Sequence, residues 1–425
     1  MAAPIAGLPY WELRFDSDGA LLADDGLVAD LPGSGVRELF VFSHGWNTSD
    51  AGARALYAYT FGELARQLAA FAPSWQGKVG VAGVYWPSLL FPEDAPDTPS
   101  DPSTPAELAA ALGPAFAPAE QDKLAAVTAL LEQQPESAEQ LSRCHQLVSG
   151  LVTSPALAGE DSGQQAVLDR PTGEVFSALA GLSSEPGDAQ GLPNPFKVLW
   201  HGAREALRTA SYYEMKNRAG VVGRDGLGPL LGSCAHATAA RGGLRVHLIG
   251  HSFGARLVSF ALPGLPEGIG SPVASLLLVQ GAFSHFSFAA PIPVDTGHNG
   301  FLAPYFDRVA GPLLSTFSLG DRAVGWWYPA ASLLNNEDDQ AASDLTYRWG
   351  GMGHDGFQQG GAEQFDLRPA GQPYPLRAGH FYRLRGDEVI KEDQSPFSGA
   401  HSDIRHPEVV WAALAGATTG VALAA

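Results

Sequence analysis

Apolar residues of the chain fall into short runs rich in Val, Leu, Ile and Phe, which alternate with longer segments of helical periodicity. Runs such as LLLV at Leu276–Val279 lack polar alternation, which is typical of strands covered on both faces. Alternation of such strands with helices indicates βαβ units, and therefore an α/β fold with a mostly parallel central sheet and helices on both faces. The clearest predicted strands are Glu38–Phe42, Lys78–Tyr85, Leu244–Ile249, Ser275–Val279, Leu313–Ser318 and His380–Leu384.

Both ends of the chain add elements to this pattern. The opening segment Tyr10–Leu22 carries Asp18-Gly19 between apolar stretches, which predicts an antiparallel hairpin at a sheet edge. The tail Trp411–Ala425 is apolar but shorter than the roughly 20 residues of a membrane-spanning helix, so we expect a docked terminal helix. The N-terminus lacks the basic start and apolar run of a secretory signal. These features predict a cytoplasmic protein without stable membrane insertion.

Residues 88–195 differ in composition from the rest of the chain. They hold 16 Asp and Glu against 3 Lys and Arg, and 13 of the 32 prolines. Thr104 and Glu107 have the spacing of a capping box around a first-turn proline, and the capping pattern recurs at SAEQ further along. We therefore predict a small helical domain, inserted after the strand that ends in VYWPS, which divides the core into residues 1–87 and 196–425.

Charge, cysteine content and the absence of several motifs limit which partners, cofactors and metals the protein is expected to bind. The formal charge is −19 at pH 7, whereas unaided binding to nucleic acid or to an anionic membrane surface needs a basic footprint. Cys144 and Cys234 are too few for a disulfide framework or a zinc cluster. No Gly-x-Gly-x-x-Gly follows a strand, and neither a P-loop nor His-Glu-x-x-His is present. We therefore expect no nucleic-acid partner, no cofactor and no metal.

The segment VHLIGHSFGARLVS changes halfway from a strand pattern to a helix pattern. The change falls on GHSFG, with Ser252 at its centre, which matches the Gly-x-Ser-x-Gly nucleophile elbow. Such a turn lifts a serine above the sheet, and the N-terminus of the following helix favours developing negative charge. In a chain with 50 glycines the bare pattern is weak, so its context decides between a nucleophile and an ordinary turn serine.

A second motif lies upstream, where the apolar run LFVFS is followed by HGWN, starting at His44, and a later strand ends in WPS, starting at Trp86. Together with the serine elbow, these motifs resemble the α/β-hydrolase superfamily, in particular a poorly characterised subgroup. The resemblance covers roughly Glu38–Pro87 and Phe196–Leu414. Many members carry their cap after the sixth strand, whereas the insertion here follows the WPS strand end. The inserted helical domain is nevertheless expected to act as a cap over Ser252, with a solvated helical appendage or an oligomer contact as the alternatives.

The resemblance implies roles for further residues. The backbone N–H groups of Trp46 and Phe253 would form the oxyanion hole, and an acid and a base should follow Ser252 in the order Asp, His, each beyond a strand end. Asp321 stands just past an apolar strand and is the preferred acid. The competing aspartates of the preceding loop are Asp295 and Asp307.

Two histidines near the C-terminus are candidates for the base. His401 occupies the loop between a strand and a helix, where this fold places its catalytic histidine, whereas His406 is expected to cap that helix. A weaker alternative is a pair formed by His354 and Asp355 on a glycine-rich loop. The histidines predicted to contact the substrate are His44, His251 and His285.

These residues predict a serine hydrolase that cleaves small carboxylic esters through an acyl-enzyme intermediate, with a Ser-His-Asp triad and no cofactor. An amidase or peptidase could use the same triad. A binding protein on the same fold would be expected to have lost a member of the triad, and this chain keeps all three.

Overall fold

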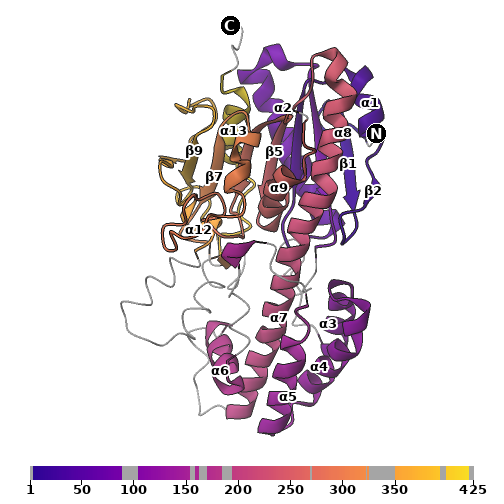
Figure 1. Ribbon diagram of the computed structural model, residues 1–425, viewed down its shortest axis with the longest axis vertical. Coiled ribbons are helices and arrows are strands. Elements are labelled where there is room, and N and C mark those ends of the chain that lie inside the picture. The colour runs from indigo at the N-terminus through magenta and orange to yellow at the C-terminus, as the bar shows by residue number, and fades with distance from the viewer. Residues whose placement is uncertain are drawn as a thin grey trace.

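The computed structural model describes residues 3–88, 104–153, 158–161, 170–183, 194–268, 270–321, 323–324, 350–392 and 399–420. Its centre is a nine-stranded sheet in the order β2-β1-β4-β3-β5-β6-β7-β9-β8 (Figure 1). Neighbouring strands are parallel except for the antiparallel pair β1 and β2. The strands are β1 Tyr10–Phe15, β2 Leu21–Ala23, β3 Glu38–Ser43, β4 Val79–Tyr85, β5 Arg245–His251, β6 Val273–Val279, β7 Leu313–Phe317, β8 Glu363–Asp366 and β9 Phe381–Arg385.

Helices cover both faces of the sheet, so the predicted α/β class is confirmed. One face packs against α2 (Asp50–Phe71) and α13 (Pro407–Thr418). The other packs against α1 (Leu27–Ser34), α9 (Phe253–Gly264) and a long helical column. That column consists of α7 (Pro195–Val221), a π-helical turn (Val222–Leu227) and α8 (Gly228–Thr238). Among the described residues, no helix is both long and apolar enough to cross a membrane.

Strand β3 shows why the apolar runs are continuous. Leu39 and Val41 point into the core beneath α9, while Phe40 and Phe42 point into the core beneath α2. Successive side chains of a strand alternate between faces, so a central strand covered on both sides must be apolar at every position. All six residues of β3 are buried accordingly.

The predicted strands are confirmed within one or two residues at each end, as is the N-terminal hairpin, whose β2 forms one edge of the sheet. The opposite edge strand, β8, is missing from the prediction. Its four residues are alternately half-buried and exposed, so no apolar run marks it. The predicted terminal helix is present as α13, with nine of its residues buried, and residues 421–425 lie outside the described part.

The acidic insertion forms a helical unit beyond the edge of the sheet at which the parallel strands have their carboxyl ends (Figure 1). Its helices are α3 (Pro105–Leu112), α4 (Gln121–Gln133), α5 (Ala138–Ser149) and α6 (Thr172–Ser183). The predicted capping box is confirmed at α3, where Thr104 Oγ1 accepts from Glu107 N at 3.3 Å and Glu107 Oε2 accepts from Thr104 N at 2.9 Å. Residues 89–103 and other parts of the predicted insertion lie outside the described residues.

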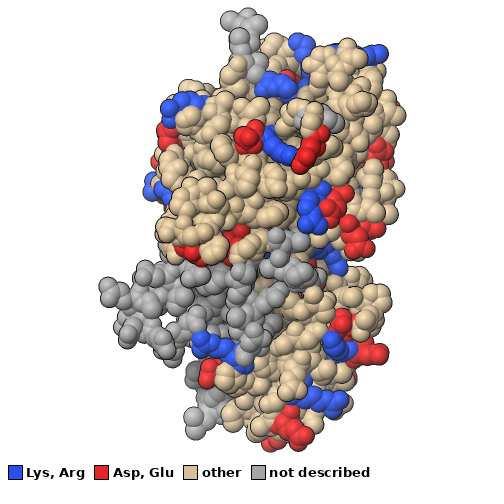
Figure 2. Space-filling model, viewed as in Figure 1, with Lys and Arg blue, Asp and Glu red and all other residues tan. Residues whose placement is uncertain are grey.

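Acidic side chains of the insertion stand mostly on its outer surface, where water solvates them. Figure 2 shows such residues on the face in view, interspersed with a few basic ones. Because exposed charges are screened by solvent and salt, the high local charge is compatible with a packed apolar interior. The exposed acidic residues of helices α3 to α6 include Glu107, Asp122, Glu132, Glu139 and Glu174.

Helix α7 belongs to both units. In its first half, a β-carbon on Gly202 would collide with the Phe176 carbonyl oxygen of α6, and Trp200 Nε1 donates to Pro135 O at 3.0 Å. Its second half packs on α9 of the core. The domain boundary expected between residues 195 and 196 therefore coincides with the start of a helix that both units share.

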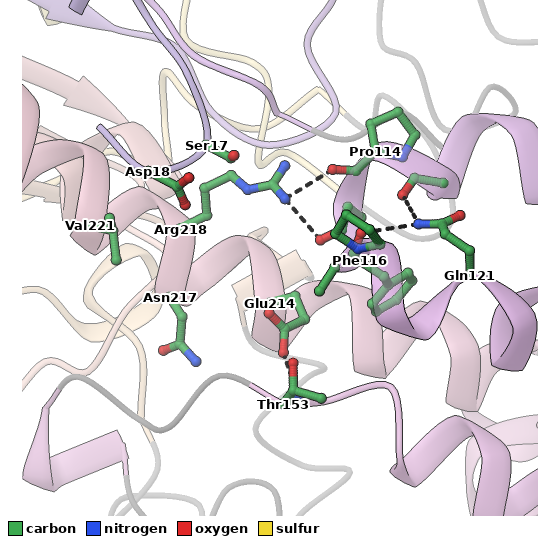
Figure 3. A pocket seen from close by; sticks show the side chains of 14 residues that line it. Ser17, Asp18, Pro114, Phe116, Gln121, Thr153, Glu214, Asn217, Arg218 and Val221 are labelled. Carbon is green, nitrogen blue, oxygen red and sulfur yellow. Dashed lines mark hydrogen bonds between the residues drawn. The ribbon is translucent and has the colours of Figure 1, made fainter. Parts of the chain in front are cut away.

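A cavity of about 620 Å³ lies where the two units meet (Figure 3). Its walls come from the hairpin turn after β1, from the segment between α3 and α4, from Thr153 and from α7. The labelled lining residues include Asp18, Phe116, Glu214 and Arg218. Ser252 and His401 are not among the residues that line it.

Candidate active site

Ser252 stands on the sharp turn between β5 and α9. Its backbone has φ 56° and ψ −124°, in the left-handed half of conformational space that a non-glycine residue rarely occupies. Such a conformation costs on the order of 1–3 kcal/mol and persists only where surrounding contacts enforce it. Here Ser252 N donates to Val279 O at 3.1 Å, and Ser252 O accepts from Ala255 N and Ala282 N, both at 3.1 Å.

Glycines at three positions make the turn possible. A β-carbon on Gly250 would lie 2.5 Å from Ala255 Cα, so β5 and α9 cross too closely for any side chain there. A side chain at Gly254 is excluded by a different contact, because a β-carbon there would collide with the Ser43 carbonyl oxygen at the end of β3. A β-carbon on Gly45 would lie 2.6 Å from Ser252 Cβ. The HGWN loop therefore lies directly against the serine.

Three residues that are distant in sequence form a chain of hydrogen bonds. Ser252 Oγ lies 2.8 Å from His401 Nε2, and His401 Nδ1 lies 2.8 Å from Asp321 Oδ2. Their exposed fractions are only 5%, 8% and 1%, so water screens these contacts weakly. With the imidazole neutral, Nδ1–H donates to the carboxylate and Nε2 accepts from the serine hydroxyl. The arrangement can remove the serine proton and hold it.

Asp321 is fixed beyond the end of β7. Its Oδ1 accepts from Val324 N at 3.0 Å, and its Oδ2 accepts from Gln280 Nε2 at 3.0 Å. Gln280 is fully buried, with φ 46°, and its Oε1 accepts from Thr316 Oγ1 at 2.9 Å. Sequence reasoning missed Gln280, because a single Gln after an apolar strand carries no signal of its partner.

The loop that carries His401 is pinned on both sides. Ala400 N donates to Gly320 O at 2.9 Å, which ties the loop to the residue before Asp321. Asp403 Oδ2 accepts from the backbone N–H groups of Lys391 and Glu392, both at 2.9 Å. These bonds leave His401 little freedom to move away from Ser252 and Asp321.

The other candidates for the acid and the base lie elsewhere. His406 occupies the N-cap position of α13, as expected, but its Nε2 binds Asp403 Oδ1 at 2.7 Å rather than the helix backbone. Asp295 pairs with His298, and Asp307 lies in a 3₁₀ turn. The suggested pair of His354 and Asp355 is wrong, since Asp355 Oδ2 lies 3.0 Å from Nδ1 of His285 instead.

Trp46 and Phe253 both lie close to Ser252. Phe253 is the first residue of α9, and the first N–H groups of a helix have no acceptor within the helix. Trp46 follows Gly45 on the loop that contacts Ser252, and its ring lies 6.1 Å from that of Phe253. The geometry is compatible with two backbone N–H groups directed at an oxyanion beside Ser252.

The three histidines expected to contact substrate each bind another group of the protein. His44 is buried, stacks on Trp86 with ring centroids 5.8 Å apart, and its Nδ1 lies 2.9 Å from Gly45 O. His251 Nε2 donates to His401 O at 3.0 Å, so His251 helps to hold the loop that carries His401. His285 is fully buried. Each of these imidazoles therefore has a partner within the protein, and its contact with substrate stays a prediction.

A second Ser-His-carboxylate arrangement occurs at the other end of the sheet. His247 Nδ1 lies 2.8 Å from Ser275 Oγ, and its Nε2 lies 2.8 Å from Glu38 Oε2. Burial lowers the pKa of His247 despite this carboxylate. Ser275 lies in the middle of β6, with no turn that exposes its hydroxyl and no helix N-terminus behind it. We interpret this cluster as a packed core network.

None of the family models, curated proteins or solved structures compared with the chain gives a match. The assignment of chemistry therefore depends on the geometry of the site.

Acidification should destabilise the fold through its buried histidines. Burial lowers the pKa of His44 to about 4 and that of His251 to about 3. Both pKa values lie below that of an unfolded histidine, so the unfolded chain binds more protons and stability is lost as the pH falls below about 6.5. Between pH 7 and pH 5 we expect a loss of about 4 kcal/mol in the free energy of unfolding.

Urea denaturation at the two pH values measures this loss. His44→Gln should remove about half of the pH dependence, and the exposed His298→Gln should leave it unchanged. An equal free energy of unfolding at pH 7 and pH 5 would contradict buried, neutral histidines at both positions.

Proposed function

We propose that this protein is a serine hydrolase that cleaves carboxylic esters through an acyl-enzyme intermediate. The observation that carries the proposal is the hydrogen-bonded chain Ser252–His401–Asp321, with both contacts at 2.8 Å and the serine on a strained strand-to-helix turn. A serine hydroxyl is a weak nucleophile without an adjacent base and a group that orients that base. Both requirements are met here, the first by His401 and the second by Asp321.

In the acylation step, Ser252 Oγ attacks the ester carbonyl carbon while its proton passes to His401 Nε2. The carbonyl oxygen becomes an oxyanion, which accepts hydrogen bonds from the backbone N–H groups of Trp46 and Phe253. Asp321 keeps Nδ1 protonated and stabilises the imidazolium without taking its proton. The carbon–oxygen bond to the alcohol then breaks, and the alcohol leaves with the proton held on Nε2.

In the deacylation step, a water molecule takes the place of the alcohol. His401 Nε2 accepts a proton from the water as its oxygen attacks the acyl carbon, and the same oxyanion site stabilises the second tetrahedral intermediate. Collapse breaks the bond to Ser252 Oγ, which recovers the proton. The products are a carboxylic acid and an alcohol, and the protein returns to its starting state.

The topology supports an α/β-hydrolase fold for this core. The nucleophile follows β5, the HGWN loop joins β3 to α2, the acid follows β7 and the histidine follows β9, which reproduces the order and placement of that fold's machinery. The insertion follows β4, on the side of the sheet that carries Ser252. That placement suits a cap over the site.

A fluorophosphonate probe tests the function directly, because it modifies only an activated serine. Ser252 should be labelled in the folded protein, and labelling should persist in Ser275→Ala, which removes a second serine bound to a histidine. Absence of labelling at Ser252 would overturn the proposal. Matched p-nitrophenyl esters and p-nitroanilides then separate an esterase from an amidase, with faster ester turnover expected.

Asp321→Asn should lower kcat for p-nitrophenyl butyrate by about 10⁴-fold, because an amide in this position favours the wrong imidazole tautomer. The measurement is steady-state kinetics on folded protein. Asp307→Asn is the matched control, since it changes an aspartate of the 3₁₀ turn that precedes β7, and should retain full activity. Equal effects of the two substitutions would show that Asp321 does not orient the base.

A further inference from the structure

Three aromatic rings form a cluster beside Ser252. Tyr212 of α7 packs on Phe253 with ring centroids 4.8 Å apart, and its ring meets that of Trp46 at 6.1 Å and 84°. The rings of Trp46 and Phe253 are themselves 6.1 Å apart. Tyr212 and Phe253 are buried and Trp46 is partly buried. Two members of the cluster are the residues whose backbone N–H groups would bind the oxyanion.

Helix α7 is held firmly against the elbow helix α9. A β-carbon on Gly223, in the π-helical turn after α7, would collide with the Leu257 carbonyl oxygen, and one on Gly264 would collide with the Arg224 carbonyl oxygen. Backbones in such close contact cannot slide past each other without a clash. The position of Tyr212 relative to Phe253 is therefore set by backbone packing further along the same helix.

A second connection runs from α7 to the HGWN loop. Arg218 donates to Pro87 O at 3.1 Å, and also to Pro114 O and Ala115 O of the insertion, the latter two bonds being drawn in Figure 3. Next to Pro87, Trp86 Nε1 donates to His44 O at 3.1 Å. The loop is thus supported by α7 directly through Tyr212 and indirectly through Arg218.

From these contacts we infer that Tyr212 is a positioning residue for the oxyanion site. Its ring packs against the side chains of both Trp46 and Phe253, and so fixes the direction of the two backbone N–H groups. An oxyanion hole acts through preorganised donors, so a small reorientation weakens binding of the transition state more than binding of the substrate. The inference rests on the proposed function, and it gives the half of α7 that packs on α9 a part in catalysis.

Tyr212→Leu tests the inference, because it removes the ring contacts and keeps a buried apolar side chain. With p-nitrophenyl butyrate we expect kcat to fall at least about 10-fold, with KM changed by less than about 3-fold, since one full oxyanion donor is worth about 10²–10³ in kcat. Binding of an alkyl trifluoromethyl ketone, which forms a tetrahedral oxyanion on the serine, should weaken by the same factor. Binding of the matching methyl ketone should not change.

Two further variants separate ring packing from general stability. Tyr212→Phe keeps the ring and should restore kcat and trifluoromethyl ketone affinity to within about 3-fold of the unmodified protein. Trp200→Leu removes a buried ring from the insertion end of α7 and should leave both values unchanged. If Tyr212→Leu does not fold, Tyr212→Met, which has nearly the same volume but no ring, replaces it.

The outcomes distinguish this inference from the proposed function. No ester turnover by the unmodified protein would overturn the function and the inference together. Turnover by the unmodified protein, with undiminished kcat and ketone affinity in Tyr212→Leu, would overturn the inference alone. Equal losses in Tyr212→Phe and Tyr212→Leu would also overturn it, because the hydroxyl rather than the ring would then be responsible.

Discussion

Ser252→Ala is expected to lower kcat for p-nitrophenyl butyrate by about 10⁶-fold while the protein stays folded. The side-chain oxygen is the only non-hydrogen atom lost. A water molecule cannot occupy the same position, 2.8 Å from His401 Nε2, with the same orientation. Alanine keeps the backbone contacts of the turn, so the elbow itself should survive. Steady-state kinetics with purified protein, together with circular dichroism, measures both effects.

Ser275→Ala provides the matched control for this substitution. Ser275 is also buried and also lies 2.8 Å from a histidine nitrogen, but it stands in the middle of a strand. We expect its loss to reduce stability slightly and to leave kcat unchanged. Residual activity of Ser252→Ala near that of the unmodified protein would mean that the nucleophile is another group, and the acyl-enzyme mechanism would have to be abandoned.

His401→Ala is expected to be about as severe as loss of the serine, because members of a triad act as a unit and their effects do not add. Without the imidazole, nothing accepts the Ser252 proton, and Asp321 is left buried without its cationic partner in the transition state. The double variant Ser252→Ala/His401→Ala should therefore be no slower than either single variant. The same ester assay measures all three.

His406→Ala is the control for the histidine. It removes an imidazole from the same loop region, but one that binds Asp403 at the start of α13. We expect kcat to change by no more than a few-fold and the melting temperature to fall slightly. If His406→Ala were the severe variant and His401→Ala the mild one, the base would be misassigned.

Much of the fold could be predicted because local patterns report burial. The apolar runs at β3, β6 and β7 identified central strands, and the Thr104–Glu107 capping box identified the start of α3. Strand β8 was not predicted, because a four-residue edge strand buries too little apolar surface to leave a pattern in the sequence. The shared helix α7 also could not be divided correctly, since its two halves have similar composition but different packing partners.

The residues of the candidate site also differ in whether a local pattern marks them. Ser252, Asp321 and His401 could be selected because each follows a strand end, and parallel strands bring their carboxyl ends to one edge of the sheet. Gln280 and Tyr212 could not, because the residues around each carry no sign of its partners. Gln280 binds a carboxylate 41 residues away, and Tyr212 meets the rings of Phe253 and Trp46, which lie on other segments.

Local sequence patterns were sufficient to predict which runs are strands, where helices begin, and where the chain can make the tight turn at GHSFG. These depend on burial, capping and glycine geometry within a few residues. Strand-end placement was enough to select His401, but the partners of His44, His251 and His285 could be identified only in the folded structure. The reason is physical: a side chain's direction is set by neighbours that are remote in sequence, and sequence spacing does not encode their distance in space.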